Sequence, residues 1–375
     1  MTERKMINIA QPSFLGNEKK YLLDTIDSGW ISSIGPYIEK FEQEFARYHG
    51  VRHAIATHNG TIALHLALVA AGITKDDEVI VPDFTFIATA NSVRYCNARP
   101  ILTDVDSDDW NISPEAVRAN ITPKTKAIIP VHLYGNPARM DEITEIAKEH
   151  NIIVIEDCAE ALGALYKKKN VGTIGDIGCF SFFGNKIITT GEGGMCITNN
   201  DFLAERMRIL RDHGMNRKKK YQYDFLGFNY RMTNMQAAIG LAQLEQLNDL
   251  LKIRDEIYCT YKTAFTGSQG IVFQETHENR NVNWIFTVRL NGLSDICREA
   301  VMADLKAQNI DSRPAFYPIH QMDFYKHGDF FRTIPENSIR ISREGISLPT
   351  FIGLDYTDIR FIAATLIESF GKQCQ

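Results

Sequence analysis

The sequence predicts an α/β protein with a large, mainly parallel β-sheet and a second, smaller α/β region toward the C-terminus. Between residues 50 and 200, short runs rich in β-branched residues alternate with segments of helical pattern. These runs are apolar almost throughout, as parallel strands are when helices cover both faces of a sheet. With 375 residues, of which 44% are hydrophobic, the chain can form a large domain over residues 1–253 and a small one over 254–375.

Each strand-like run is followed by a helix-like segment. In chain order, the expected elements are His53–Thr57 then Ile62–Ala71, Glu78–Pro82 then Ile87–Tyr95, Pro100–Val105 then Pro114–Asn120, Lys126–Leu133 then Met140–Glu149, and a strand at Ile152–Ile155. Ligands of such sheets bind at the carboxyl ends of the strands. Asn59, Phe86, His132 and Asp157 fall at these ends, so we expect a site at this edge.

The remaining chain has longer helical patterns and a few strands. Residues 201–252 read as helical, with Asp201 as a possible N-cap and one buried face formed by Leu241, Leu244, Leu247 and Leu251. Strands are expected at Trp284–Leu290 and Asp311–Ala315, and a last helix from Thr357. About the first 45 residues are expected to pack against this second region.

Charge and cysteine content exclude several classes of protein. A net charge of −5 and a pI near 6.1 leave no basic field for nucleic acid, and the one cationic cluster, residues 217–220, fits a solvated loop or a loop that attracts an anionic substrate. The seven cysteines form no C-x-x-C pair, which indicates reduced thiols and no metal site. Neither a signal peptide nor a long apolar run is present, so we expect a cytoplasmic protein that does not bind membranes.

Lys186 and Asp157 together indicate the cofactor pyridoxal 5′-phosphate (PLP). Lys186 lies in an apolar, glycine-rich stretch, about thirty residues after the apolar run that ends at Asp157. PLP chemistry needs a lysine amine that bonds the cofactor aldehyde and a carboxylate that keeps the pyridine nitrogen protonated. A lone lysine is usually a surface charge, and an aspartate after a strand is often a turn residue. The apolar setting favours chemistry, because a semi-buried lysine shifts its pKa readily.

Asn59-Gly60-Thr61 is a candidate phosphate-binding turn. It precedes an alanine- and leucine-rich segment, and a glycine turn at the start of a helix directs free backbone N–H groups toward an anion. Alone, this turn cannot be distinguished from an ordinary helix N-cap. The presence of Lys186 and Asp157 in the same chain is what favours phosphate binding. No G-x-G-x-x-G or Walker A pattern is present, which argues against dinucleotide enzymes and nucleotide triphosphatases.

These segments, in this order, resemble the DegT/DnrJ/EryC1/StrS family of sugar aminotransferases, which are PLP enzymes of fold type I. The resemblance is carried by Gly29-Trp-Ile-Ser-Ser33, Asn59-Gly-Thr61, Val131-His-Leu-Tyr-Gly135, Ile155-Glu-Asp157, Ser181-Phe-Phe-Gly-Asn-Lys186, Gly227-Phe-Asn-Tyr-Arg-Met-Thr-Asn234 and Gly345-Ile-Ser-Leu-Pro349. It implies an aspartate aminotransferase-like fold, with a seven-stranded, mainly parallel sheet in the large domain and a small C-terminal α/β domain.

The resemblance also implies which residues meet the cofactor ring. Lys186 would bond the aldehyde, Asp157 would pair with the pyridine nitrogen and Phe86 would stack on the ring. Glu160, counted among the cofactor-binding residues, stands where many relatives have glutamine. One subgroup, the perosamine synthases, has glutamate there and also resembles this chain in the segment Arg313-Pro-Ala-Phe-Tyr-Pro-Ile-His320.

The same resemblance implies that Gly60, Thr61 and Ser181 bind the cofactor phosphate. Asn229 would reach the phosphate of the neighbouring subunit's cofactor, which implies a homodimer with shared active sites. Relatives that act as dehydratases carry histidine in place of the lysine, so Lys186 argues against that reaction.

The implied reaction converts a nucleotide-linked 4-keto-6-deoxyhexose to its 4-amino sugar with L-glutamate as donor. The perosamine synthase pattern implies GDP-perosamine as the product, for O-antigen or other polysaccharide synthesis. Arg313, Tyr317 and His320 offer a cation, an aromatic ring and a donor for the substrates, although each fits a rigid, solvated loop equally well. A dTDP-4-amino-4,6-dideoxyglucose transaminase, a PLP-binding regulatory protein without turnover and a purely structural dimer remain alternatives.

Overall fold

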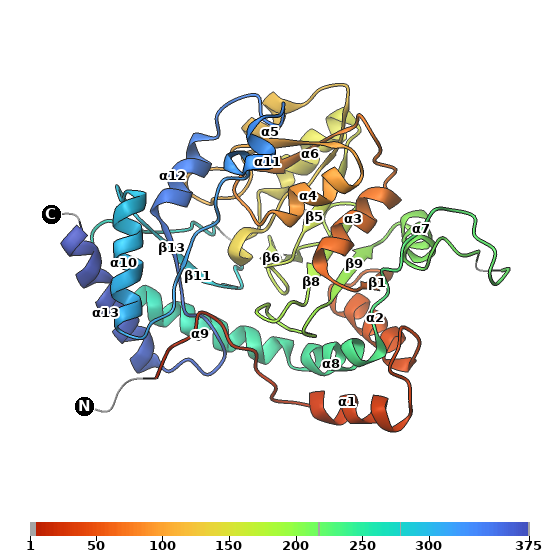
Figure 1. The fold of residues 1–375 in the computed structure, drawn as a ribbon, viewed down its shortest axis with the longest axis horizontal. Helices are drawn as coiled ribbons and strands as arrows, with labels where there is room; N and C mark the ends of the chain where they lie inside the picture. The colour runs from red at the N-terminus through yellow and green to blue at the C-terminus, as the bar shows by residue number, and fades with distance from the viewer. Residues whose placement is uncertain (1–4, 217, 278, 374–375) are drawn as a thin grey trace.

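The large domain of the computed structural model is built on a seven-stranded sheet (Figure 1), and the structure describes residues 5–216, 218–277 and 279–373. The strands are β1 (His53–Thr57), β2 (Glu78–Pro82), β3 (Arg99–Thr103), β4 (Thr125–Ile128), β5 (Ile153–Asp157), β8 (Ile177–Ser181) and β9 (Gly194–Thr198). Their order across the sheet is β1-β9-β8-β5-β4-β2-β3. β9 runs antiparallel to β1 and β8, and the other neighbours are parallel. The predicted large, mainly parallel sheet is confirmed.

Helices cover both faces of this sheet, as its apolar strands require. One face packs on α3 (Gly60–Ala70), α4 (Ala88–Tyr95) and α7 (Asp201–Arg211). The other packs on α2 (Pro36–His49), α5 (Pro114–Asn120), α6 (Met140–His150) and α8 (Asn234–Glu245). Short elements, η1 (Leu133–Gly135), β6 (Leu165–Tyr166) and β7 (Lys169–Asn170), lie in the loops around β5.

A second, antiparallel sheet forms the centre of the C-terminal region. Its strands, in order across the sheet, are β10 (Ile271–Phe273), β11 (Phe286–Leu290), β13 (Gly345–Leu348) and β12 (Arg313–Pro314). They share a separate apolar core with α9 (Leu247–Ala264), α10 (Asp295–Ala307) and α13 (Tyr356–Gln373), seen at the left of Figure 1. The remaining elements are η2 (Ile319–Gln321), α11 (Asp323–Lys326) and α12 (Glu336–Glu344). This region is the expected smaller α/β unit.

The N-terminal segment runs between the two regions. Ile7 pairs with Ile310 in a parallel bridge, and the carbonyl oxygen of Ile9 accepts a hydrogen bond from Thr350 N at 2.8 Å. The first described residues therefore lie against the C-terminal region. In contrast, α1 (Glu18–Asp27) and α2 lie against α8. The packing expected for about the first 45 residues is wrong for these two helices.

Residues 201–252, which the sequence pattern predicts to be helical, are helical only in part. The chain leaves α7 after residue 211, runs as a loop over residues 212–233 and re-enters helical structure in α8 and α9. Asn200, not Asp201, is the N-cap of α7, because its side chain accepts two backbone N–H groups of the first turn. A capping box at Thr233 starts α8.

The loop over residues 212–233, here called the arm, extends away from the sheet at the right of Figure 1. Gly214, at φ +76°, lies near its start, and a Cβ atom there would overlap the carbonyl oxygen of Phe225. Several large side chains of the arm are exposed: Tyr221, Tyr223, Phe225 and Leu226. The cationic cluster lies in the arm too, with Lys218 to Lys220 exposed and Arg217 outside the described residues.

The described cysteines are all free thiols. Four of them, Cys96, Cys158, Cys179 and Cys196, are buried in the cores of the large domain. Within the same described ranges, no helix combines the length and the apolar composition that crossing a bilayer requires.

Candidate active site

The carboxyl end of β5 places a buried carboxylate at the edge of the sheet. Asp157 Oδ2 accepts a hydrogen bond from Thr89 Oγ1 at 2.8 Å, and Oδ1 accepts one from Ala159 N at 3.1 Å. Burial raises the pKa of Asp157, while these hydrogen bonds and the charge of Lys186 oppose the rise. Each oxygen keeps a lone pair for a further donor, and a cation placed there would hold the carboxylate ionised.

Lys186 lies in the loop between β8 and β9, with 12% of its side chain exposed. Its Nζ atom is 4.0 Å from Glu160 Oε1 and 3.6 Å from the centroid of the Trp284 ring. Burial lowers the pKa of Lys186, while the charges of Glu160 and Asp157 oppose this change. The amine therefore loses its proton more readily than a surface lysine does.

Glu160 is the second buried carboxylate of the site. Burial raises its pKa to about 7, against the lowering effects of the Lys186 charge and a hydrogen bond from Tyr134 N. That bond, 2.7 Å long to Oε2, also holds Tyr134 at φ +54°, a left-handed conformation that bulky residues rarely adopt. Near neutral pH, Glu160 is therefore present in both its protonated and its ionised form.

Gly60, Thr61 and Ser181 meet at the N-terminus of α3. The side chain of Asn59 caps the helix through Ile62 N, and the described hydrogen bonds include none from the backbone N–H groups of Gly60 and Thr61. A Cβ atom on Gly60 would lie 2.7 Å from the Cβ of Ser181, so only glycine allows this close approach. The turn thus offers free donors to an anion.

An aromatic wall connects Lys186 to Phe86. The Trp284 and Tyr134 rings are stacked with centroids 6.4 Å apart, and Tyr134 is stacked on Phe316 at 5.3 Å. Phe86 lies 6.2 Å from Phe316 and is 56% exposed, so one face of its ring is available to a planar ligand.

These parts fit PLP. Lys186 supplies a semi-buried amine, Asp157 a buried carboxylate with unused acceptor capacity, and the N-terminus of α3 a set of unbonded N–H donors beside Ser181. Together they match an aldehyde, a protonated ring nitrogen and a phosphate.

His320 is bound to the large domain by Asp83. Its Nδ1 atom lies 2.7 Å from Asp83 Oδ2, and its backbone N–H donates to Oδ1 at 2.8 Å. Asp83 directly follows β2 and is fully buried. The role predicted for His320 is substrate binding. One nitrogen of its ring already binds a carboxylate, so only the rest of the ring can serve that role.

Tyr317 and Arg313 lie apart from this contact. The Tyr317 hydroxyl accepts a hydrogen bond from Arg298 at 3.4 Å, and its ring is half exposed. The Arg313 guanidinium is exposed and lies 3.9 Å from the carboxylate of Asp311. Both stay candidate substrate-binding residues.

Asn229 lies in the arm. Its Oδ1 atom accepts a hydrogen bond from Arg231 Nε at 3.0 Å, and its backbone bridges to Asp212. No interaction between described residues joins Asn229 to Lys186 or Asp157 within one chain. Its contact with the cofactor phosphate of a neighbouring subunit stays a prediction.

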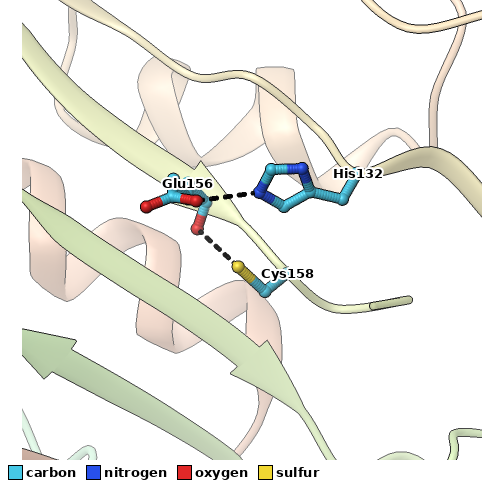
Figure 2. A group of neighbouring side chains, drawn as sticks. All are labelled: His132, Glu156 and Cys158. Carbon is cyan, nitrogen blue, oxygen red and sulfur yellow. Dashed lines mark hydrogen bonds and ion pairs between the residues drawn. The ribbon is translucent and has the colours of Figure 1, made fainter. Parts of the chain in front are cut away.

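His132, Glu156 and Cys158 form a buried group beneath the site (Figure 2), with potential ligand atoms within 4.8 Å of one another. The Glu156 carboxylate accepts hydrogen bonds from His132 Nε2 and from three backbone N–H groups of residues 172–175. His132 Nδ1 accepts one from Ala138 N at 3.0 Å. These atoms are already bonded within the protein, so the group holds two loops together rather than offering a metal site.

Sequence reasoning missed Trp284, Tyr134, Thr89 and Asp83 as parts of the site. Tyr134 lies within the segment Val131-His-Leu-Tyr-Gly135, whose position after a strand was a usable signal. Asp83 directly follows the strand-like run Glu78–Pro82 and so carried the same signal, whereas no local pattern distinguished Trp284 and Thr89 from core residues.

Comparisons with known proteins agree with this geometry. A family description, the DegT/DnrJ/EryC1/StrS aminotransferase family, matches residues 13–367. A GDP-perosamine synthase of Caulobacter vibrioides is 49% identical over 98% of this chain and 99% of its own, and one of Escherichia coli O157:H7 is 44% identical over 98% and 100%. The PLP-form of Spr1654 from Streptococcus pneumoniae, described as a sugar aminotransferase, has a TM-score of 0.92 and 27% identity, with 98% of each chain covered.

Proposed function

The chain belongs to the DegT/DnrJ/EryC1/StrS aminotransferase family, and we propose that within it this enzyme converts GDP-4-keto-6-deoxymannose to GDP-perosamine with L-glutamate as amino donor. It is a PLP-dependent sugar aminotransferase. Two relatives named GDP-perosamine synthase, at 49% and 44% identity over nearly the whole chain, support the GDP-linked sugar.

The observation that carries the proposal is the enclosed cluster of Lys186, Asp157 and Glu160. A lysine with 12% exposure, 4.0 Å from one carboxylate and within the electrostatic reach of a second, is costly to bury. This cost is explained if Lys186 supplies a reactive amine.

PLP supplies an aldehyde carbon that bonds amines and a pyridine ring that accepts electron density when a C–H bond breaks. In this chain, Lys186 would hold the aldehyde carbon and Asp157 the ring nitrogen. Gly60, Thr61 and Ser181 would hold the phosphate, as their free donors and close approach support.

Lys186 Nζ is the atom that moves protons in the reaction. Because burial lowers the pKa of Lys186, a neutral amine is accessible to take the proton from Cα of the amino donor. Glu160, with a pKa of about 7 and 4.0 Å away, can relay a proton to or from this amine. The wall formed by Trp284 and Tyr134 excludes water from this exchange.

A homodimer with shared active sites is part of the proposal. The arm exposes four large apolar or aromatic side chains, more than a free surface loop favours, and it also carries Asn229. In a dimer these side chains would be covered, and Asn229 would reach the phosphate in the neighbouring subunit.

The sugar nucleotide and the donor would enter along the aromatic wall. Phe86 offers an open face for the cofactor ring. Its ring also contacts Phe316, which belongs to the same segment as Arg313, Tyr317 and His320. A cation and two polar tips there suit a diphosphate or a donor carboxylate.

Turnover with GDP-linked and with dTDP-linked 4-keto-6-deoxyhexoses, each with L-glutamate, tests the proposal. We expect clear preference for the GDP-linked sugar, and no multiple turnover in Lys186→Ala or in Lys186→Arg, the control that keeps the positive charge. Preference for the dTDP-linked sugar would point to the dTDP-4-amino-4,6-dideoxyglucose transaminase. Bound PLP with no turnover on any ketosugar would point to a regulatory protein.

A further inference from the structure

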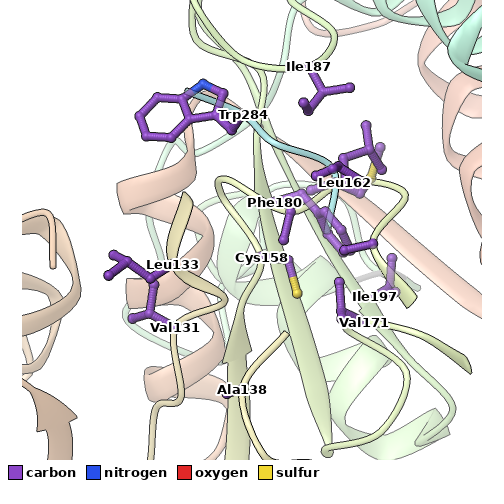
Figure 3. Packing of buried hydrophobic residues seen from close by; sticks show 14 of the residues in the cluster. Val131, Leu133, Ala138, Cys158, Leu162, Val171, Phe180, Ile187, Ile197 and Trp284 are labelled. Atoms are coloured by element: carbon purple, nitrogen blue, oxygen red, sulfur yellow. The ribbon is translucent and has the colours of Figure 1, made fainter. Parts of the chain in front are cut away.

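Trp284 is the aromatic side chain that contacts the amine of Lys186. The centroid of its ring lies 3.6 Å from Nζ, a distance at which a cation sits on the ring face. Figure 3 shows Trp284 at the upper margin of the buried cluster, with Val131 and Leu133 below it. The indole is therefore a surface against which the amine rests.

Contacts that do not involve the lysine side chain hold the indole in place. Its Nε1 atom donates to the Asn185 carbonyl oxygen at 2.7 Å, and its backbone N–H donates to the Tyr134 carbonyl oxygen at 3.1 Å. Its ring stacks on Tyr134 with an interplanar angle of 17°. The ring face thus stays where it is when the amine moves away.

The carboxyl groups of Glu160 and Asp157 face Lys186, but neither is always available as a counterion for its ammonium. Glu160 has a pKa of about 7, so near neutral pH it is ionised only part of the time. Asp157 is bonded to Thr89 and Ala159, and in the proposed reaction it serves the ring nitrogen. The face of an indole is electron-rich and does not titrate, so it attracts an ammonium at every working pH.

We propose that Trp284 is a positioning residue whose indole face docks the Lys186 ammonium, that is, the amine when it is protonated and carries no covalent bond. The lysine is then retained beside the reacting centre and returns to it from a fixed direction. This inference rests on the proposed function only in assuming that the amine alternates between bonded and free states. The contact on which it depends, the Lys186 amine on the face of the Trp284 indole, is present in the chain without any ligand.

The test measures how the reactivity of the Lys186 amine depends on pH. Full-length enzyme is treated with L-glutamate to free the amine, and in parallel the full-length chain is prepared without cofactor. Both are labelled with cyanate over a pH series, and modification of Lys186 is quantified by peptide mass spectrometry. We expect Trp284→Leu to shift the midpoint to lower pH and to speed labelling about three- to tenfold near neutral pH, because the ammonium loses its stabilising face. Trp284→Phe, which keeps a ring, should retain most of the wild-type behaviour.

Two features make the result decisive. If Trp284 only filled space, its truncation would admit water and move the midpoint upward, opposite to the expected direction. Trp110→Phe is the matched control, because it alters another buried tryptophan of the same core and should leave the midpoint unchanged. An unchanged or raised midpoint in a folded Trp284→Leu protein overturns the inference. Labelling of the cofactor-free chain does not depend on turnover, so this measurement would remain valid even if the proposed reaction were wrong.

Discussion

Asp157 combines a charge with two hydrogen bonds, and the two contributions can be separated by substitution. Asp157→Asn keeps a group of the same shape that accepts one hydrogen bond, but it cannot hold a cationic ring nitrogen. We expect kcat to fall about 100-fold or more, a typical loss when one charged stabilising group is removed from a site. Thr89→Val, which removes only the hydrogen bond from an uncharged hydroxyl to Oδ2, should cost about tenfold or less. Steady-state kinetics decides, and near-wild-type kcat in Asp157→Asn would make Asp157 a turn residue.

Glu160 should make the stability of the cofactor-free protein depend on pH. Its folded pKa, about 7, lies above the ordinary value of 4.5, so between these values the folded state binds a proton that the unfolded state releases. Stability from this group is therefore present at low pH and is lost as pH rises through 7. Between about pH 5 and about pH 8 the loss should be roughly 1–3 kcal/mol, and Glu160→Gln should lack it.

Urea unfolding at both pH values measures this effect. Glu145→Gln, which removes an exposed carboxylate from α6, is the control for the change in net charge. Identical pH dependence in wild type and Glu160→Gln would contradict a raised pKa at this position.

At the scale of residues, the sequence was sufficient for groups whose chemistry is local. Lys186 stands out because a lysine among phenylalanines and glycines is an unusual setting, and Asp157 draws its significance from its spacing to Lys186. Trp284 could not be found in this way, since its partners Lys186 and Asn185 are about a hundred residues away and only tertiary packing brings them together.

At the scale of elements, the arm makes the clearest prediction. Leu226 is 93% exposed, and Leu226→Asp should split the proposed dimer, because a carboxylate would be buried without a partner in the proposed interface. Activity should fall with dimerisation, while the secondary structure stays intact. Ile296→Asp is the control, since Ile296 is 83% exposed in the first turn of α10. Sedimentation at several protein concentrations would show the change, and a fully active monomer would refute shared sites.

The elements themselves were predictable where periodicity and caps agree. β1, β2 and α5 have the expected bounds, because each is bordered by clear turn or cap residues. The helical structure expected over residues 201–252 was wrong for the arm, because the arm contains enough apolar residues to continue a helical pattern. Those side chains face outward, and a single sequence does not distinguish a face that meets a partner from one that meets a core.

At the scale of the whole molecule, Asp83 joins the two regions. Its carboxylate accepts both hydrogen bonds from His320, so Asp83→Ala would leave buried donors without partners and cost about 2–4 kcal/mol of stability. We expect KM for ketosugar and glutamate to rise more than kcat falls, because the segment with Tyr317 and His320 loosens. Asp323→Ala is the control, since that aspartate is 94% exposed and pairs only within α11. Unchanged stability and unchanged KM would show that the contact is incidental.

The overall architecture was the most predictable property of the chain. Alternating strand and helix patterns required a parallel sheet covered on both faces, and the structure has it. The placement of α1 and α2 against α8 was not predictable, because amphipathic helices carry no information about which apolar surface they cover.

The three tryptophans occupy three different surroundings, and this has a spectroscopic consequence. Trp30 is half exposed, Trp110 is buried in the core, and Trp284 touches the amine that would bond the cofactor. A chromophore attached to Lys186 would therefore accept excitation energy from Trp284 at short range. In a chain whose other two tryptophans are replaced by phenylalanine, the intrinsic emission would become a direct optical gauge of how many sites are loaded.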